Sequence, residues 1–100
     1  MVILLVDDQA TVLSSLKSGI NWTALSIHTI YTAQNALEAK EIILSHNIDI
    51  LLSDIEMPKE NGLSLLRWCR QQGYTFECIF LTSHADFFYA QEAIQLGSFD

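Results

Sequence analysis

Three acidic residues follow two hydrophobic segments of the sequence. Asp7 and Asp8 come directly after an aliphatic run at residues 2–6, and Asp54 comes directly after a second run at residues 48–53. Clustered carboxylates repel one another, so without a counter-ion at least one of them would resist ionisation. A hard divalent cation removes that conflict, and oxygen ligands without His or Cys nearby suit Mg²⁺. An Asp beside Mg²⁺ can attack phosphorus, so these residues indicate phosphoryl chemistry if the fold brings them together.

Strand-like and helix-like segments alternate along the chain. The two aliphatic runs are typical of strands buried on both faces of a parallel sheet. Asn35 followed by Glu38 resembles a capping box, and Gly19 and Gly73 are candidate helix ends. We therefore expect strands at residues 2–6, 27–33, 48–53 and 78–82, and helices at residues 10–18, 35–46, 63–73 and 86–97.

This alternation predicts an α/β fold, a flavodoxin-like doubly wound parallel sheet with helices on both faces. Ligands in such sheets bind beyond the carboxyl ends of the strands, where the strand order reverses. In the order 2-1-3-4 the first and third strands are neighbours. Asp7, Asp8 and Asp54 should then converge on one crevice.

Length and composition predict one globular domain over residues 1–100, since half of the residues are hydrophobic and only one is Pro. The net charge of −7 disfavours nucleic-acid binding, because the phosphates of nucleic acid are also negative. The apolar run at residues 2–6 is too short to span a bilayer, which favours a cytoplasmic location. We expect Cys69 and Cys78 to be reduced thiols that are buried in the core or half-buried.

Three motifs resemble the receiver domain of bacterial response regulators, the CheY-like family. They are Leu-Leu-Val-Asp-Asp-Gln at residues 4–9, Ser-Asp-Ile-Glu-Met-Pro at residues 53–58 with Asn-Gly after it, and Phe-Leu-Thr-Ser at residues 80–83. Their order and spacing match that family over the whole chain. The resemblance implies a two-component signalling domain that is not an enzyme beyond its own phosphorylation and dephosphorylation.

The resemblance also implies a role for individual residues. Asp54 would accept a phosphoryl group from a sensor histidine kinase, and Asp7 and Asp8 would hold Mg²⁺ directly or through water. Glu56 would offer its main-chain carbonyl to the metal. Thr82 would hydrogen-bond a phosphoryl oxygen and so sense phosphorylation. In addition, Pro58 and Gly62 would shape the loop after Asp54.

Residues 19–22 and 86–90 resemble the receivers of AraC-type (YesN-like) regulators, which implies control of transcription through a DNA-binding domain outside this chain. The family pattern continues with a fifth strand, which carries a lysine, and a fifth helix. We therefore expect the domain at residues 1–100 to be incomplete at its C-terminus. Residues 78–82 would then form an open hydrophobic edge, with homodimers possible through edge pairing or exchange of elements.

Other interpretations remain open at this point. Asp54 and Glu56 are spaced like the nucleophile and acid of Mg²⁺-dependent aspartyl phosphatases, although those lie on a first strand. A flavodoxin-like FMN carrier would need Ser, Thr and Gly in place of Asp7 and Asp8. A receiver-like interaction module without phosphorylation is the third alternative. Asp8 could also serve only as a helix cap.

The remaining polar residues have simpler interpretations. His28 and His46 are expected to be structural or on the surface. His84, two residues after Thr82, could line the site and, with Glu56, affect hydrolysis of the phosphorylated residue. We expect Lys59 and Glu60 to be solvated loop charges.

Overall fold

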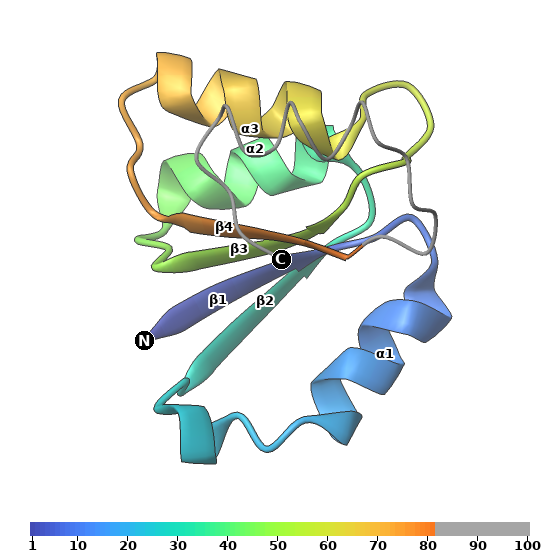
Figure 1. Cartoon of the computed structure of the whole chain (residues 1–100), viewed down its shortest axis with the longest axis vertical. Helices are drawn as coiled ribbons and strands as arrows, with labels where there is room; N and C mark the ends of the chain where they lie inside the picture. Colours follow the sequence, from blue (N-terminus) through green and yellow to red (C-terminus); the bar gives the residue numbers. More distant parts are fainter. Residues whose placement is uncertain (82–100) are drawn as a thin grey trace.

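The structure is a computed structural model in which residues 1–81 are described. Four parallel strands form one sheet in the order β2-β1-β3-β4, as expected (Figure 1). The strands are β1 (Val2–Val6), β2 (Thr29–Ala33), β3 (Ile50–Asp54) and β4 (Glu77–Leu81), and the helices are α1 (Ala10–Gly19), a 3₁₀ turn η1 (Thr23–Leu25), α2 (Ala36–Ser45) and α3 (Gly62–Gln71). Thr82 and the helix predicted at residues 86–97 lie outside the described residues.

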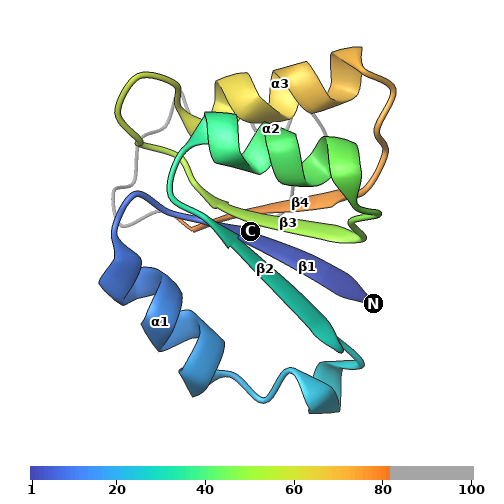
Figure 2. The ribbon, with the colours of Figure 1, turned by 180° about the vertical axis from the view of Figure 1, so that it is seen from behind.

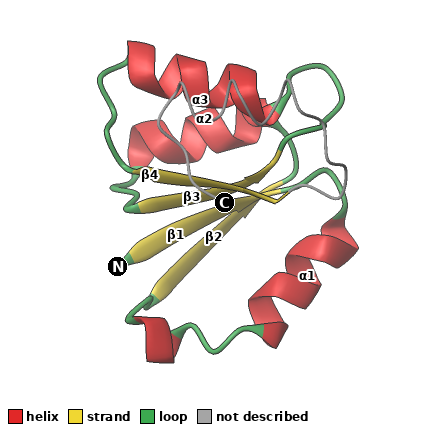
Figure 3. Ribbon diagram, viewed as in Figure 1, coloured by secondary structure: helices red, strands yellow, loops and turns green. Residues whose placement is uncertain are grey.

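Helices cover both faces of the sheet. Helices α2 and α3 lie side by side on one face and α1 lies on the other, which is visible from both sides in Figures 1 and 2. Figure 3 shows the same arrangement by element type, with the strands forming the middle layer. Each βαβ connection therefore crosses over one face of the sheet, as parallel strands require.

Side chains of β1 alternate between two hydrophobic clusters. Leu4 and Val6 pack in the cluster under α2 and α3, whereas Ile3 and Leu5 pack in the cluster under α1. The neighbouring strand β3 does the same with Leu51 on the first face and Leu52 on the second. This period of two explains why β1 is apolar throughout and β3 is apolar up to Leu52: both faces of these strands are buried.

The predicted helix ends are only partly correct. The Asn35 side chain caps α2 by accepting a hydrogen bond from the Glu38 N–H (2.8 Å), and Glu38 accepts one from the N–H of Gln34 (2.8 Å), so the reciprocal cap forms one residue earlier than in a capping box. Gly73 follows α3 with a φ of +90°, the left-handed conformation that favours glycine. Gly19 also ends a helix as predicted, but it is itself the last residue of α1, one residue beyond the predicted range, and the chain continues in extended geometry at Ile20.

Three strands begin or end one or two residues away from the predicted positions. β2 starts at Thr29 because Ile27 belongs to the turn region: its N–H donates to the carbonyl of Trp22 (3.0 Å). The hydrophobic pattern did not indicate the turn η1 that precedes it. β3 runs from Ile50 and includes Asp54, which the sequence placed in the following loop. Cys69 and Cys78 are buried and free, as predicted. None of the helices among residues 1–81 has the length and apolar character of a membrane span.

Candidate functional site

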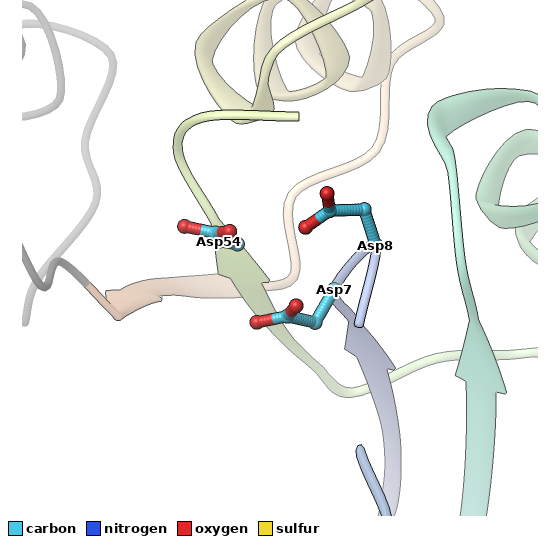
Figure 4. A group of neighbouring side chains, drawn as sticks. All are labelled: Asp7, Asp8 and Asp54. Atoms are coloured by element: carbon cyan, nitrogen blue, oxygen red, sulfur yellow. The ribbon is translucent and has the colours of Figure 1, made fainter. Parts of the chain in front are cut away.

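The register of β1 and β3 brings the acidic residues together. Val6 pairs with Ser53 in parallel register, so Asp7, just after β1, and Asp54, the last residue of β3, lie side by side at the carboxyl ends of these strands. Asp8 follows in the loop to α1. Figure 4 shows the three carboxyl groups facing a common space beyond the strand ends. The predicted convergence of Asp7, Asp8 and Asp54 is thus present in the structure.

The carboxyl groups are close enough to share one ion. One oxygen from each of Asp7, Asp8 and Asp54 lies within 4.8 Å of the others. Asp7 is the most enclosed, with 7% of its surface exposed, and Asp8 is more open to solvent. The cluster is therefore anchored in the sheet on one side and accessible on the other.

Main-chain groups fix the Asp7 side of the cluster. The Asp7 N–H donates to the carbonyl of Ala33 at the end of β2 (3.1 Å), and Asp7 Oδ1 accepts a hydrogen bond from the N–H of Gln9 (2.9 Å). Gln9, not Asp8, occupies the N-cap position of α1, and no side chain caps that helix. The interpretation of Asp8 as only a helix cap is therefore wrong.

Burial and mutual repulsion raise the pKa of two of the acids. For Asp7 the main cause is burial, opposed by the hydrogen bond from Gln9 and reinforced by the neighbouring Asp8. For Asp54 burial is again the largest cause and the charge of Asp7 adds to it, while the main-chain N–H groups of Glu56 and Ile55 lower its pKa. Bringing these charges together is unfavourable in the absence of a cation.

The donor set fits a hard divalent cation. It consists of carboxylate oxygens alone, it carries several negative charges, and its members lie within 4.8 Å of one another. Mg²⁺ binds in proteins through one or two carboxylates and keeps waters that phosphate oxygens can replace. Chemically, the cluster could bind such an ion and expose one carboxylate, that of Asp54, to an electrophilic phosphorus.

The segment after Asp54, which we call the acceptor loop (residues 55–61), turns sharply back to start α3. The N–H of Gly62 donates to the carbonyl of Ile55 (2.7 Å), and Asn61 caps α3 by accepting from the Ser64 N–H (2.8 Å). A Cβ on Gly62 would overlap the main-chain oxygen of Asp54 and stand 2.9 Å from the Phe80 ring. Gly62 thus permits the close approach of α3 to the end of β3, in line with the predicted shaping role.

The structure places the other predicted residues as follows. Glu56 is exposed in the acceptor loop, two residues from Asp54, and Pro58 is exposed in the same loop. Thr82 and His84 lie outside the described residues, so their predicted roles stay predictions. His28 is exposed, and His46 packs edge-on against Tyr31 with ring centroids 4.4 Å apart.

One prediction in this region is wrong: Glu60 is not a solvated loop charge. Its carboxylate accepts hydrogen bonds from Lys40 Nζ (2.8 Å) and from Ser64 Oγ (3.0 Å), and its side chain is 28% exposed. Lys40 lies on α2, twenty residues earlier in the chain. No local pattern marks a pair so far apart, so the sequence could not reveal it. Lys59 is exposed, as expected, with a φ of +72°.

Comparison with known proteins adds evidence that is independent of this geometry. The model of the response regulator receiver domain family matches residues 3–100. Among curated proteins, the transcriptional regulatory protein HptR of Staphylococcus aureus (strain NCTC 8325 / PS 47) is 34% identical over 95 residues, which cover 93% of this chain and 36% of HptR. The chain thus spans little more than a third of the length of that relative.

Two solved structures resemble the chain along most of its length. A two-component transcriptional regulator AraC from Clostridium phytofermentans ISDg is 33% identical with a TM-score of 0.87, covering 95% of this chain and 74% of the other. The receiver domain of AraT, a response regulator from Geobacillus stearothermophilus, is 32% identical with a TM-score of 0.86, covering 97% and 75%. These neighbours agree with the predicted resemblance to AraC-type receivers. With its strand order, its acid cluster and a family match that covers nearly all of its length, this chain belongs to the response regulator receiver domain family.

Proposed function

We propose that this receiver domain is phosphorylated on Asp54 in a reaction that requires Mg²⁺. The observation that supports the proposal most directly is the convergence of the Asp7, Asp8 and Asp54 carboxyl groups beyond the ends of β1 and β3. Asp54 is the acceptor because it alone of the three ends β3 and receives main-chain N–H groups from the acceptor loop. Residues 1–100 act together as this phosphoacceptor domain.

In the proposed transfer, a carboxylate oxygen of Asp54 forms the new bond to phosphorus. The bond between phosphorus and the imidazole nitrogen of a phosphohistidine breaks, and the leaving nitrogen keeps the electron pair and takes up a proton. A bound Mg²⁺ would offset negative charge on the transferring group. Asp7 and Asp8 would hold it directly or through water, together with the Asp54 carboxylate and the main-chain carbonyl of Glu56.

Membership of the receiver domain family supports the choice of phosphoryl donor. We propose that the donor is a sensor histidine kinase and that the transfer takes place in the cytoplasm. Both relatives are named transcriptional regulators. HptR is much longer than this chain, which matches only 36% of its length. We therefore propose that phosphorylation controls transcription through a DNA-binding domain that lies outside this chain. Thr82 is the proposed sensor of the phosphoryl group.

A homodimer formed by edge pairing or exchange of elements remains a prediction. Light scattering at several protein concentrations would test it.

The acceptor is tested by intact mass spectrometry after incubation with phosphoramidate and Mg²⁺. Wild-type protein should gain the mass of one phosphoryl group, and the gain should need Mg²⁺. Asp54→Asn keeps the size of the side chain but removes the nucleophile, so this variant should gain nothing. The exposed Asp49→Asn is the control with the same chemical change, and it should be labelled like wild type. Undiminished labelling of Asp54→Asn would disprove the assignment.

The alternative of an aspartyl phosphatase predicts a different result. Such an enzyme should hydrolyse a small phosphomonoester with many turnovers, whereas a receiver should not turn it over efficiently. A steady-state assay with Mg²⁺ separates the two. Absence of labelling and of turnover together would favour the interaction module.

A further inference from the structure

We propose that Lys40 is a positioning residue for the acceptor loop and that it acts through the carboxylate of Glu60. The inference rests on the proposed function, because the property being tuned is the affinity of the acid cluster for Mg²⁺. Lys40 lies on α2 and is not a member of the acid cluster. Its ammonium donates its hydrogen bond to Glu60 instead.

Glu60 connects three elements of the structure. Its Oε1 accepts a hydrogen bond from Lys40 Nζ on α2 (2.8 Å), and its Oε2 accepts one from Ser64 Oγ in the first turn of α3 (3.0 Å). Its own N–H donates to the carbonyl of Pro58 within the loop (2.8 Å). Both carboxylate oxygens and the main chain are thereby engaged, so the position of Glu60 depends on α2 as well as on α3.

Lys40 is itself held on its other side. Its Nζ lies 5.4 Å from the centroid of the Trp68 ring on α3, a cation–π distance. The side chains of Lys40 and Glu60 are 23% and 28% exposed, so the pair is screened by water less than a fully exposed one. Glu60 and the Trp68 ring together hold the Lys40 ammonium in place. These contacts offset part of the entropy cost of keeping a long side chain in one geometry.

The acceptor loop is also the segment that borders the acid cluster. At its start, the N–H groups of Ile55 and Glu56 donate to the Asp54 carboxylate, and the proposed carbonyl ligand belongs to Glu56. At its far end, Glu60 and Asp8 line the same pocket, with a volume of about 340 Å³. A shift of Glu60 would therefore be transmitted over a few residues to the groups that orient Asp54.

The first test is the dissociation constant of Mg²⁺ measured by calorimetry on the full chain. Lys40→Met keeps an unbranched apolar stem but removes the ammonium. We expect its dissociation constant for Mg²⁺ to rise about threefold to tenfold. This effect is smaller than that of removing a group that hydrogen-bonds a metal ligand directly, because Lys40 acts through Glu60. Lys40→Arg should stay within about twofold of wild type because it keeps the charge. The rate of labelling by phosphoramidate at limiting Mg²⁺ should fall in parallel.

Lys17→Met is the matched control for this charge change. Lys17 is exposed on α1, on the opposite face of the sheet, and its loss makes the same change in net charge. A more negative chain should attract Mg²⁺ slightly more strongly, so a weaker affinity in Lys40→Met cannot come from net charge alone. Equal dissociation constants for Lys40→Met and Lys17→Met would overturn the inference.

A double variant tests whether Lys40 acts through Glu60. Glu60→Gln should weaken Mg²⁺ binding to a similar extent, and Lys40→Met combined with Glu60→Gln should be no worse than either change alone. Additive effects would show that Lys40 acts by another route and would also overturn the inference. Wild-type protein that neither binds Mg²⁺ nor gains a phosphoryl group would refute the proposed function, and this inference with it.

Discussion

At the scale of single residues, the site brings together Asp7, Asp8 and Asp54, whose negative charges repel one another. Burial is the largest cause of the raised pKa of both Asp7 and Asp54, and neighbouring negative charges add to it. A chain that keeps such a cluster loses stability when no cation is bound, because ionising these groups is easier in the unfolded chain. We therefore expect a divalent cation that binds the cluster to stabilise the folded chain.

This cost should appear in the dependence of stability on pH. Below the ordinary pKa of 3.8 both carboxyl groups are protonated in the folded and unfolded chains, so they contribute no difference. As the pH rises past that value the unfolded chain ionises first, and the free energy of unfolding falls until the raised pKa values are passed. Asp7→Asn should therefore melt higher than wild type near neutral pH in the presence of a chelator, and no higher at about pH 3.

The measurement is the difference in Tm between wild type and Asp7→Asn across that range, where about 1 kcal/mol corresponds to roughly 4–8 °C for a domain of this size. Asn keeps an oxygen that can accept the hydrogen bond from Gln9, so the local fold is preserved. Asp49→Asn provides the control, since Asp49 lies outside the acid cluster. A difference that does not change with pH would argue against the assigned cause.

The acid cluster could be predicted from sequence because each acid follows directly on a recognisable hydrophobic strand. Whether a residue directly follows a strand can be read from the neighbouring residues in the sequence. Parallel strands then place their carboxyl ends at the same edge of the sheet. The pair of Lys40 and Glu60 could not be predicted, because it depends on how two crossover helices pack and on where a loop turns back. Contacts of this kind are decided by tertiary structure alone.

At the scale of secondary-structure elements, the sequence identified every strand and every α-helix among residues 1–81 but not all of their ends. The strand β1 was predicted at its observed limits because Asp7 and Asp8 end its apolar run. The turn η1 was missed, and β3 was placed two residues too early at its start. Apolar residues continue into the flanking turns here, so hydrophobicity alone does not mark where hydrogen-bonded pairing begins.

The packing of α3 against the end of β3 should depend on Gly62. A methyl group there would overlap the Asp54 main-chain oxygen and crowd Ser53 Oγ and Phe80. We expect Gly62→Ala to lower the free energy of unfolding by about 1–3 kcal/mol, the usual cost of overpacking, and to weaken Mg²⁺ binding because β3 would be displaced near Asp54.

Urea unfolding with Gly19→Ala as the control checks this expectation. Gly19 is the last residue of α1, and a Cβ there would meet nothing within 4 Å. Alanine at that position should be neutral or stabilising by up to about 1 kcal/mol, because it favours the helical conformation. Equal stabilities for the two variants would contradict the packing argument.

At the scale of the whole molecule, the net charge of −7 and the acid cluster are two separate electrostatic features. The first acts over the surface and opposes binding of this chain to nucleic acid, which supports placing the proposed DNA contact in another part of a longer protein. The second is local, since its oxygens lie within 4.8 Å of one another. The two should respond differently to salt.

Monovalent salt should relieve the surface repulsion but not the local one. Raising NaCl from about 0.01 M to about 0.15 M shortens the screening length from roughly 30 Å to roughly 8 Å, which still exceeds the spacing within the cluster. We expect NaCl to raise Tm by similar amounts in wild type, in Asp8→Ala and in Glu41→Ala, an exposed acid on α2 with the same change in charge. MgCl₂ at equal ionic strength should raise Tm further in wild type and in Glu41→Ala, because the ion binds the folded chain alone. In Asp8→Ala that additional increase should be lost. Thermal melts followed by circular dichroism measure all three proteins, and an additional increase of the same size in Asp8→Ala would mean that Mg²⁺ acts on the general negative charge and not at the acid cluster.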